Sequence, residues 1–325
     1  MLFCVTELVI KMLKKFFLAL ALMFFVISNC AAKSEVLDVD EVIPTVTGRT
    51  DTYARYFDWP QADLKMDIVR PVTKEKTPAV IFVPGGGWIT APKAQGVQLT
   101  FKLAEAGFAV ASIEYRTIVQ ANYIDIVGDA KAAVRYLRTH ADEFNIDKNK
   151  IAIMGVSAGG WLASMVEVTE GVEKFDFGEN LDQSSKVQAV VDFFGPSDLT
   201  KWGADYSKDK QELYTSASSE VSLLANGLAD YKGNKGGSIL DTPETAKATN
   251  PITYISKNTP PFLIFHGNND TTVSSSQSKI LYDALIKNNI QADYYIINGG
   301  EHKLKYFYQP KTFKIIVDFL NKTLK

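Results

Sequence analysis

Short apolar runs alternate with amphipathic segments from residue 52 to the end of the chain, and this alternation predicts the fold. Continuous apolar runs such as residues 79–83 are typical of strands that are buried on both faces. The predicted strands cover residues 53–57, 64–69, 79–83, 108–113, the run that begins at Ile151, 187–194, 262–265 and 292–297. The predicted helices cover residues 98–106, 125–140, 161–168, 275–287 and 311–323. Strands that alternate with helices predict an α/β fold with a mostly parallel central sheet and helices on both faces. The first two strands are expected to form an antiparallel pair at the edge of that sheet.

Several polar or glycine-rich positions follow predicted strands directly. They are Gly85–Gly87, Ser157, Asp270 and His302. Open α/β sheets bind ligands at the carboxyl ends of their strands. We therefore expect these four positions to gather at one edge of the sheet.

The serine lies in the motif Gly155-Val156-Ser157-Ala158-Gly159, between the run from Ile151 and the helical pattern at 161–168. This arrangement predicts a strand, a tight turn and a helix, with the serine at the apex of the turn. A serine there adopts strained backbone angles, and its hydroxyl lies beside the N–H groups at the start of a helix. Ser157 is thus a candidate nucleophile, although a short glycine–serine pattern is also compatible with an ordinary turn.

A serine nucleophile needs a base within hydrogen-bond reach, and three histidines are available. His140 lies near the end of a predicted helix, where a surface role is expected. His266 follows an apolar strand and is expected to shape the turn that presents Asp270, with the role of base as its alternative. His302 lies in the glycine-containing loop after the last strand, and it is the predicted catalytic base.

Asp270 is the predicted third member of a triad. An aspartate after a strand is often only a turn residue or a helix cap. Its place between Ser157 and His302 completes the chain order Ser, Asp, His, which is the order of α/β-hydrolases. Glu301 is the alternative carboxylate, but as the neighbour of His302 it would meet the imidazole from the wrong side.

The three glycines at 85–87 predict an oxyanion hole. Without side chains, the backbone N–H groups of Gly86 and Gly87 can approach a developing alkoxide, and the N–H of Ala158 completes the set. A flexible loop is the alternative interpretation.

Composition narrows the classes of function. Of the 325 residues, 46% are hydrophobic and 22% are charged, which suits a normal buried core. The formal net charge of −2 gives no electrostatic basis for nucleic-acid binding. The histidines and cysteines lack the spacing of a metal site, so the sequence implies no metal. It implies no organic cofactor either. The oligomeric state stays open.

The N-terminal segment predicts export. Lys14 and Lys15 precede an apolar run at 16–27 that is short for a membrane span, so residues 1–30 are expected to be a signal peptide whose true start could be Met12. Cys30 matches the lipidated cysteine of a bacterial lipoprotein, which would tether the protein to a membrane outside the cytoplasm, in the periplasm or at the cell surface. An ordinary cleavage near Ala32 is the alternative.

The rest of the chain divides into two predicted parts. Residues 31–50 are polar and acidic and are expected to be a flexible tether, and residues 51–325 form the catalytic domain. Residues 200–250 interrupt the strand–helix alternation. We predict that this insertion forms a small, partly helical cap over the site.

These motifs, taken in order, resemble the α/β-hydrolase carboxylesterases of the hormone-sensitive-lipase type and the bacterial feruloyl and acetyl-xylan esterases. The resemblance spans about residues 64–320 and is carried by Pro84–Trp88, Glu114–Arg116, Asp129–Leu137, Gly155–Gly160, Phe194–Leu199, Pro260–Asp270 and Gly300–His302. It implies the triad Ser157, Asp270 and His302, and an oxyanion hole at Gly86, Gly87 and Ala158.

Two positions depart from the family pattern. Pro84 replaces the histidine that usually precedes the three glycines, and Trp161 replaces a histidine that often follows Gly160. Trp88 and Trp161 are candidates for the substrate pocket, although Trp161 could equally pack in the core.

The resemblance implies hydrolysis of carboxylic esters, with acetyl or feruloyl groups on plant polysaccharide such as xylan as the expected substrates. A general short-chain carboxylesterase or lipase is an alternative. A peptidase or amidase of the same fold is another, but such peptidases usually carry a propeller domain. An inactive hydrolase fold that serves as a binding protein is the alternative from a different class.

Overall fold

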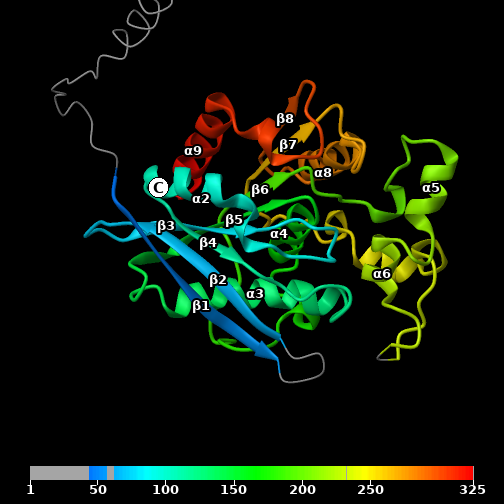
Figure 1. Cartoon of the computed structure of the whole chain (residues 1–325), viewed down its shortest axis with the longest axis horizontal. Helices are drawn as coiled ribbons and strands as arrows, with labels where there is room; N and C mark the ends of the chain where they lie inside the picture. The colour runs from blue at the N-terminus through cyan, green and yellow to red at the C-terminus, as the bar shows by residue number, and fades with distance from the viewer. Residues whose placement is uncertain (1–43, 57–61, 232, 325) are drawn as a thin grey trace, which may run out of the picture. The chain divides into compact units, whose positions relative to one another are not determined.

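The computed structural model describes residues 44–56, 62–231 and 233–324, which belong to a compact unit that begins at Pro44. In this unit eight strands form one sheet in the order β1-β2-β4-β3-β5-β6-β7-β8 (Figure 1). β2 pairs antiparallel with β1 and β4, and the other neighbouring strands are parallel. The strands are β1 (Val46–Tyr56), β2 (Ala62–Pro71), β3 (Thr77–Val83), β4 (Ala109–Ile113), β5 (Ile146–Val156), β6 (Val190–Phe193), β7 (Phe262–Gly267) and β8 (Ala292–Ile297).

Helices cover both faces of the sheet, and the alternation of side chains along each strand divides the core into two clusters. In β3, Ile81 and Val83 contribute to the cluster that contains the buried residues of α3, α4 and α8. Val80 and Phe82 contribute to the other cluster, with residues of α2 and α9. These helices are α2 (Val97–Glu105), α3 (Tyr123–Thr139), α4 (Ala158–Val168), α8 (Ser275–Lys287) and α9 (Pro310–Leu324). The predicted α/β fold and its antiparallel edge pair are confirmed.

Local sequence explains where these elements begin. The side chain of Asn122 accepts hydrogen bonds from the N–H groups of Ile124 (2.8 Å) and Asp125 (3.2 Å) at the start of α3. The Asp125 carboxylate in turn accepts the N–H of Asn122 at 3.2 Å, which completes a capping box. Leu64, Met66 and Ile68 of β2 are buried at alternate positions, as expected for an antiparallel strand with one face on the core.

The insertion between β6 and β7 is partly helical where the structure describes it, as predicted. Trp202 donates its indole N–H to the carbonyl of Thr272 at 2.9 Å, and the Tyr206 hydroxyl donates to the carbonyl of Asp270 at 3.0 Å. The insertion therefore packs on the loop after β7, while a lid function stays a prediction. Its helices are α5 (Lys208–Thr215), α6 (Glu220–Asn226) and α7 (Pro243–Ala248), with 3-10 turns at η3 (Leu199–Lys201), η4 (Ile239–Asp241) and η5 (Pro251–Thr253), and Figure 1 shows α5 and α6 to one side of the sheet.

The described part of the chain begins at Pro44, within the predicted tether. β1 begins at Val46, so the predicted tether at 31–50 extended too far. The polar residues of 46–50 form a strand because their backbone pairs with β2 while most of their side chains face solvent. The predicted signal peptide, Met12, Cys30 and the first part of the tether lie outside the described residues. Within the described ranges, every helix is too short or too polar to cross a membrane.

The close approach of β5 and α4 depends on Gly155. A Cβ atom at this position would lie 2.7 Å from the backbone nitrogen of Gly160 and would overlap the carbonyl of Gly159. Neither backbone can move independently, because β5 is paired on both sides and α4 is buried along its whole length. Glycine at 155 is therefore required for this strand–helix packing.

We predict that Gly155→Ala lowers the free energy of unfolding by about 1–3 kcal/mol, the usual cost of overpacking. Gly48→Ala is the matched control, since a Cβ in that edge strand would lie no closer than 3.4 Å to any neighbour. Urea denaturation of both variants measures the effect. Equal stability of the two variants would contradict the packing argument.

Candidate active site

Ser157 lies at the apex of the turn between β5 and α4. Its backbone has φ 57° and ψ −121°, which is a strained conformation for a residue with a side chain. The N–H of Ser157 donates to the carbonyl of Phe193 in the neighbouring strand at 2.8 Å, and this bond holds the turn. The side chain is thereby presented at the carboxyl edge of the sheet.

His302 connects the serine to an acid. Its Nε2 atom lies 2.7 Å from the Ser157 hydroxyl oxygen, and its Nδ1 atom lies 2.6 Å from Oδ2 of Asp270. The three predicted triad residues, which are up to 145 positions apart in the chain, therefore form one continuous hydrogen-bonded series. Glu301, the alternative carboxylate, pairs with Lys303 at 3.0 Å.

The Asp270 carboxylate is buried, yet it is held as an anion. Its Oδ1 atom accepts the N–H groups of Thr272 (2.9 Å) and Val273 (3.0 Å). Burial alone would raise the pKa of Asp270, but hydrogen bonds from His266, His302 and Thr272 outweigh it and hold the pKa well below its usual range. Asp270 can thus stay charged when the imidazole of His302 gains a proton.

The loop that carries Asp270 and the loop that carries His302 pack against each other through glycines. A Cβ at Gly267 would lie 2.9 Å from Cα of Gly300, so the two backbones pack without side chains between them. Asn269 N–H donates to the carbonyl of Gly300 at 2.9 Å, and the Asn268 side chain accepts the N–H of Gly299 at 2.7 Å. Gly300 therefore permits a close contact, which the sequence alone did not distinguish from a flexible loop.

The glycine loop after β3 lies directly beside the serine. A Cβ at Gly85 would lie 3.1 Å from Cβ of Ser157, and Gly86 and Gly87 have φ angles of 139° and 59° that side chains disfavour. Pro84 is supported by the Tyr115 hydroxyl, which donates to the Pro84 carbonyl at 2.9 Å. The glycine loop thus begins in contact with Ser157 and continues through two backbone conformations that favour glycine.

Ala158 supplies a further N–H at the same place. It is the first residue of α4, and the first N–H groups of a helix have no partner within the helix. The proposed oxyanion donors Gly86, Gly87 and Ala158 therefore belong to segments that flank Ser157. Their role in binding charge stays a prediction.

Trp88 and Trp161 are buried, so neither side chain lines an open pocket; for Trp161 this is the core position that the sequence left as its alternative. Both side chains are 0% exposed, and their rings meet edge to face with centroids 5.4 Å apart. The Trp161 indole N–H donates to the carbonyl of Thr249 at 2.7 Å, and Trp202 of the insertion packs on Trp88 at 5.7 Å. Edge-to-face aromatic contacts stabilise both rings there, and the buried hydrogen bond satisfies Trp161. Among the described residues the buried Trp88 indole N–H has no hydrogen-bond acceptor.

The other two histidines have different surroundings. His140 ends α3, where its Nδ1 atom lies 2.9 Å from the Tyr136 carbonyl and its ring stacks on Tyr136 at 4.0 Å. This agrees with the helix-end role expected for it. His266 is fully buried, and its Nε2 atom lies 3.2 Å from Oδ2 of Asp270. His266 was expected to shape the turn that presents Asp270, but this contact with the carboxylate was not predicted from the sequence.

Asp192 is a buried carboxyl beneath the turn that sequence reasoning missed. Its Oδ1 atom accepts the N–H of Gly195 at 2.9 Å, and a Cβ at Gly160 would overlap that oxygen. Burial raises the pKa of Asp192 to about 7, although the bond from Gly195 and the nearby His266 lower it. An aspartate inside an otherwise apolar strand was the available signal.

The raised pKa of Asp192 predicts a pH-dependent stability difference. The unfolded chain releases this proton near the ordinary aspartate pKa of 3.8, whereas the folded protein retains it up to about 7. Asp192 therefore destabilises the fold progressively as pH rises from about 4 to 7, and no further above that range. We expect Asp192→Asn to gain stability relative to the wild type over this window in urea denaturation. A stability difference that is constant from pH 4 to 8 would contradict the assignment.

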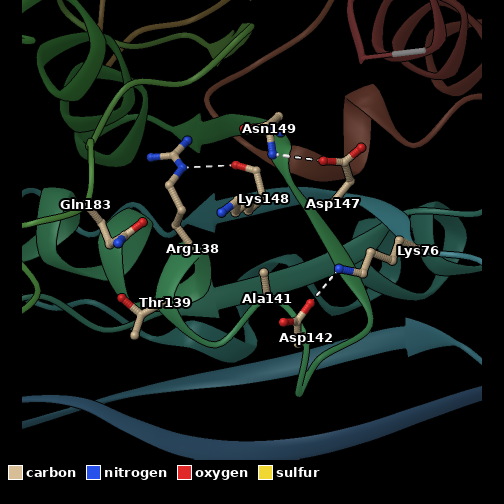
Figure 2. A pocket seen from close by; sticks show the side chains of 9 residues that line it. All are labelled: Lys76, Arg138, Thr139, Ala141, Asp142, Asp147, Lys148, Asn149 and Gln183. Atoms are coloured by element: carbon tan, nitrogen blue, oxygen red, sulfur yellow. Dashed lines mark hydrogen bonds and ion pairs between the residues drawn. The ribbon is translucent and has the colours of Figure 1, made fainter.

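A hollow of about 400 Å³ lies far from this site (Figure 2). Asp147, Lys148 and Asn149 contribute to it from the amino end of β5, whereas Ser157 follows the carboxyl end, about 25 Å away at the usual rise of a strand. In Figure 2 the Arg138 guanidinium bonds the Lys148 carbonyl, at 2.9 Å. The hollow is a surface feature of the opposite edge. In the part of the chain that the structure describes, no group of three or more His, Cys, Asp or Glu side chains is arranged to hold a metal ion.

Solved structures of esterases share this fold and arrangement of elements. A truncated carbohydrate esterase from gut microbiota is 29% identical, with a TM-score of 0.73, and the match covers 86% of this chain and 97% of that chain. A bifunctional GH43-CE protein of Bacteroides eggerthii is 30% identical with a TM-score of 0.70, over 80% of this chain and 36% of that one. The esterase Est2 of Thermogutta terrifontis is 25% identical with a TM-score of 0.66, over 85% and 92% of the two chains.

Curated relatives are also esterases. Esterase LipC of Mycobacterium tuberculosis is 28% identical over 69% of this chain and 52% of its own length. A probable isoprenylcysteine alpha-carbonyl methylesterase of Arabidopsis thaliana is 27% identical over 76% and 49%. The chain thus spans about half the length of the curated relatives it matches. The model of the BD-FAE family matches residues 66–285, which is more than half of the chain. The chain therefore belongs to the BD-FAE family, a family of α/β-hydrolase carbohydrate esterases.

Proposed function

We propose that this protein is a serine-dependent carboxylic ester hydrolase in which Ser157 is the nucleophile, His302 the base and Asp270 the acid. The observation that carries the proposal is the hydrogen-bonded series Ser157–His302–Asp270, with contacts of 2.7 Å and 2.6 Å. The family membership supports the reaction class. A serine hydroxyl becomes an effective nucleophile when a histidine in this position takes its proton.

The mechanism follows from this geometry. Oγ of Ser157 attacks the ester carbonyl carbon while Nε2 of His302 accepts the hydroxyl proton. The oxygen of the carbonyl gains negative charge, which the N–H groups of Gly86, Gly87 and Ala158 stabilise. His302 then returns the proton to the leaving alcohol, and an acyl-enzyme forms on Ser157.

Deacylation repeats these steps with water. His302 takes a proton from the water, the hydroxide attacks the acyl carbon, and the acid leaves as Ser157 regains its proton. Asp270 stays ionised throughout, because the hydrogen bonds on its carboxylate hold its pKa low. Its charge stabilises the imidazolium and fixes the tautomer of His302.

We infer that the substrates are acetyl or feruloyl esters of plant polysaccharide such as xylan. Two of the similar solved structures are described as a carbohydrate esterase and a bifunctional GH43-CE protein, which supports an ester on sugar. The predicted signal peptide supports the same inference, since polysaccharide is met outside the cytoplasm. We likewise propose export to the periplasm or cell surface, with Cys30 as a lipid tether.

A general short-chain carboxylesterase is the second candidate. It is supported by curated relatives that are described as an esterase and as a probable isoprenylcysteine alpha-carbonyl methylesterase, with no polysaccharide in their names. The peptidase and the inactive binding protein have less support, because the family and each relative described above are esterases.

Ester release from defined substrates separates these candidates. We predict that the purified protein releases acetate or ferulate from acetylated and feruloylated xylan oligosaccharides faster than it cleaves simple aryl esters. Ser157→Ala should lower every ester activity by at least about 10³-fold, as expected for loss of a nucleophile. The exposed Ser218→Ala is the control and should leave activity unchanged. Faster turnover of aryl esters would favour the general esterase, and undiminished activity of Ser157→Ala would remove the serine mechanism.

The two carboxylates beside the base can be compared directly. Asp270→Asn should lower kcat by up to about 10⁴-fold, because the amide favours the wrong tautomer of His302. Glu301→Gln should leave kcat nearly unchanged, since Glu301 pairs with Lys303 and not with the imidazole. Steady-state kinetics on an aryl acetate measures both, and a greater loss in Glu301→Gln would overturn the choice of acid.

A further inference from the structure

His266 is a buried polar side chain that the mechanism above does not use. It is the penultimate residue of β7, and its imidazole is 0% exposed. Nδ1 lies 2.7 Å from the Ser278 hydroxyl on α8, and Nε2 lies 2.9 Å from the Val273 carbonyl. Nε2 is also 3.2 Å from Oδ2 of Asp270. Both ring nitrogens are therefore engaged, and one of them faces the acid.

These contacts assign the tautomer of the ring. A carbonyl oxygen only accepts hydrogen bonds, and so does an ionised carboxylate. Nε2 must therefore carry a hydrogen, which it donates to the Val273 carbonyl, and the same N–H group lies beside Oδ2 of Asp270. In the neutral ring Nδ1 then accepts the hydroxyl hydrogen of Ser278, and this bond prevents the ring from flipping. His266 is thus a fixed N–H group beside Asp270.

With His266 included, the acceptor sites of the Asp270 carboxylate are filled. An ionised carboxylate offers about four lone-pair sites. Two backbone N–H groups, from Thr272 and Val273, occupy Oδ1. His266 and His302 share Oδ2. Each oxygen therefore has two N–H groups beside it, which restricts the rotation of the carboxylate about its Cβ–Cγ bond.

We propose that His266 is a positioning residue for ester hydrolysis, which holds Oδ2 of Asp270 so that this oxygen faces Nδ1 of His302. The proposal rests on the catalytic roles proposed above for Ser157, His302 and Asp270. Without the His266 donor, Oδ2 would have a free lone pair and the carboxylate could turn away from His302. His302 would then lose the partner that sets its tautomer and orientation.

Packing around the two histidines makes this donor hard to replace. The Phe194 ring lies 4.6 Å from the His302 ring and 6.2 Å from the His266 ring, measured between centroids. Phe194 is itself buried and has a φ of 46°, which is strained for a phenylalanine. Since the side chains of His266 and Asp270 are both fully buried, solvent offers no substitute N–H.

Two substitutions of His266 separate positioning from simple packing. Glutamine places an amide N–H about as far from Cα as Nε2, so His266→Gln keeps a donor for Asp270 and loses the Ser278 contact. Asparagine places its amide near Nδ1, so His266→Asn keeps the Ser278 contact and loses the donor. Both variants remove a buried ring, so thermal unfolding should show comparable losses of stability.

We expect His266→Asn to lower kcat on an aryl acetate by about 10–100-fold with KM unchanged, the range for loss of a residue that orients a functional group. His266→Gln should retain most of the wild-type kcat. Equal kcat in the two variants, or activity that follows their thermal stability, would overturn the proposal. If His266→Asn does not fold, His266→Met decides, because a thioether has no hydrogen to donate: a kcat below that of His266→Gln at unchanged KM supports the proposal, and a kcat equal to that of His266→Gln contradicts it.

Ser157→Ala in the same assay keeps the two hypotheses apart. Activity that survives Ser157→Ala removes the catalytic assignment itself. An inactive Ser157→Ala together with a fully active His266→Asn removes only the positioning role of His266.

Discussion

The hydrogen bond of 2.6 Å between Asp270 and His302 depends on a buried carboxylate that stays charged. An unpaired charge at this depth would be very costly, so the carboxylate must find donors on both oxygens. The backbone of the turn after β7 supplies two, and the two histidines supply the others. This requirement explains why the loops after β7 and β8 pack glycine against glycine, since any side chain between them would separate the acid from the base.

The catalytic edge could be predicted from the sequence because its signals are local. A glycine-flanked serine between a strand and a helix has few other conformations, and the chain order of Ser157, Asp270 and His302 restricts the choice of partners. A parallel sheet then brings the ends of its strands to one edge. The antiparallel edge pair was predictable for a similar reason. Apolar and polar residues alternate along β2, and this alternation can be read from that segment alone.

The remaining features depend on how distant segments face one another. The tryptophans at 88 and 161 follow a glycine-rich loop and a nucleophile turn, where a pocket is a reasonable expectation. Their inward packing is decided by Thr249 and Trp202, which belong to the insertion and its end. The orientation of the His266 ring similarly depends on Ser278 of α8, and Asp192 is recognisable only once Gly160 and Gly195 are seen against it. The tether was predicted too long because the start of β1 is polar and is stabilised by its partner strand.

The central claim is that Ser157 carries the acyl group during turnover. The most direct measurement is peptide mass spectrometry of protein that is acid-quenched while it turns over a nitrophenyl acetate. We expect an acetyl group on the peptide that contains Ser157 and on no other serine. An acetyl group on a different residue, or steady turnover with unmodified Ser157 under conditions that trap acyl-enzymes, would contradict it.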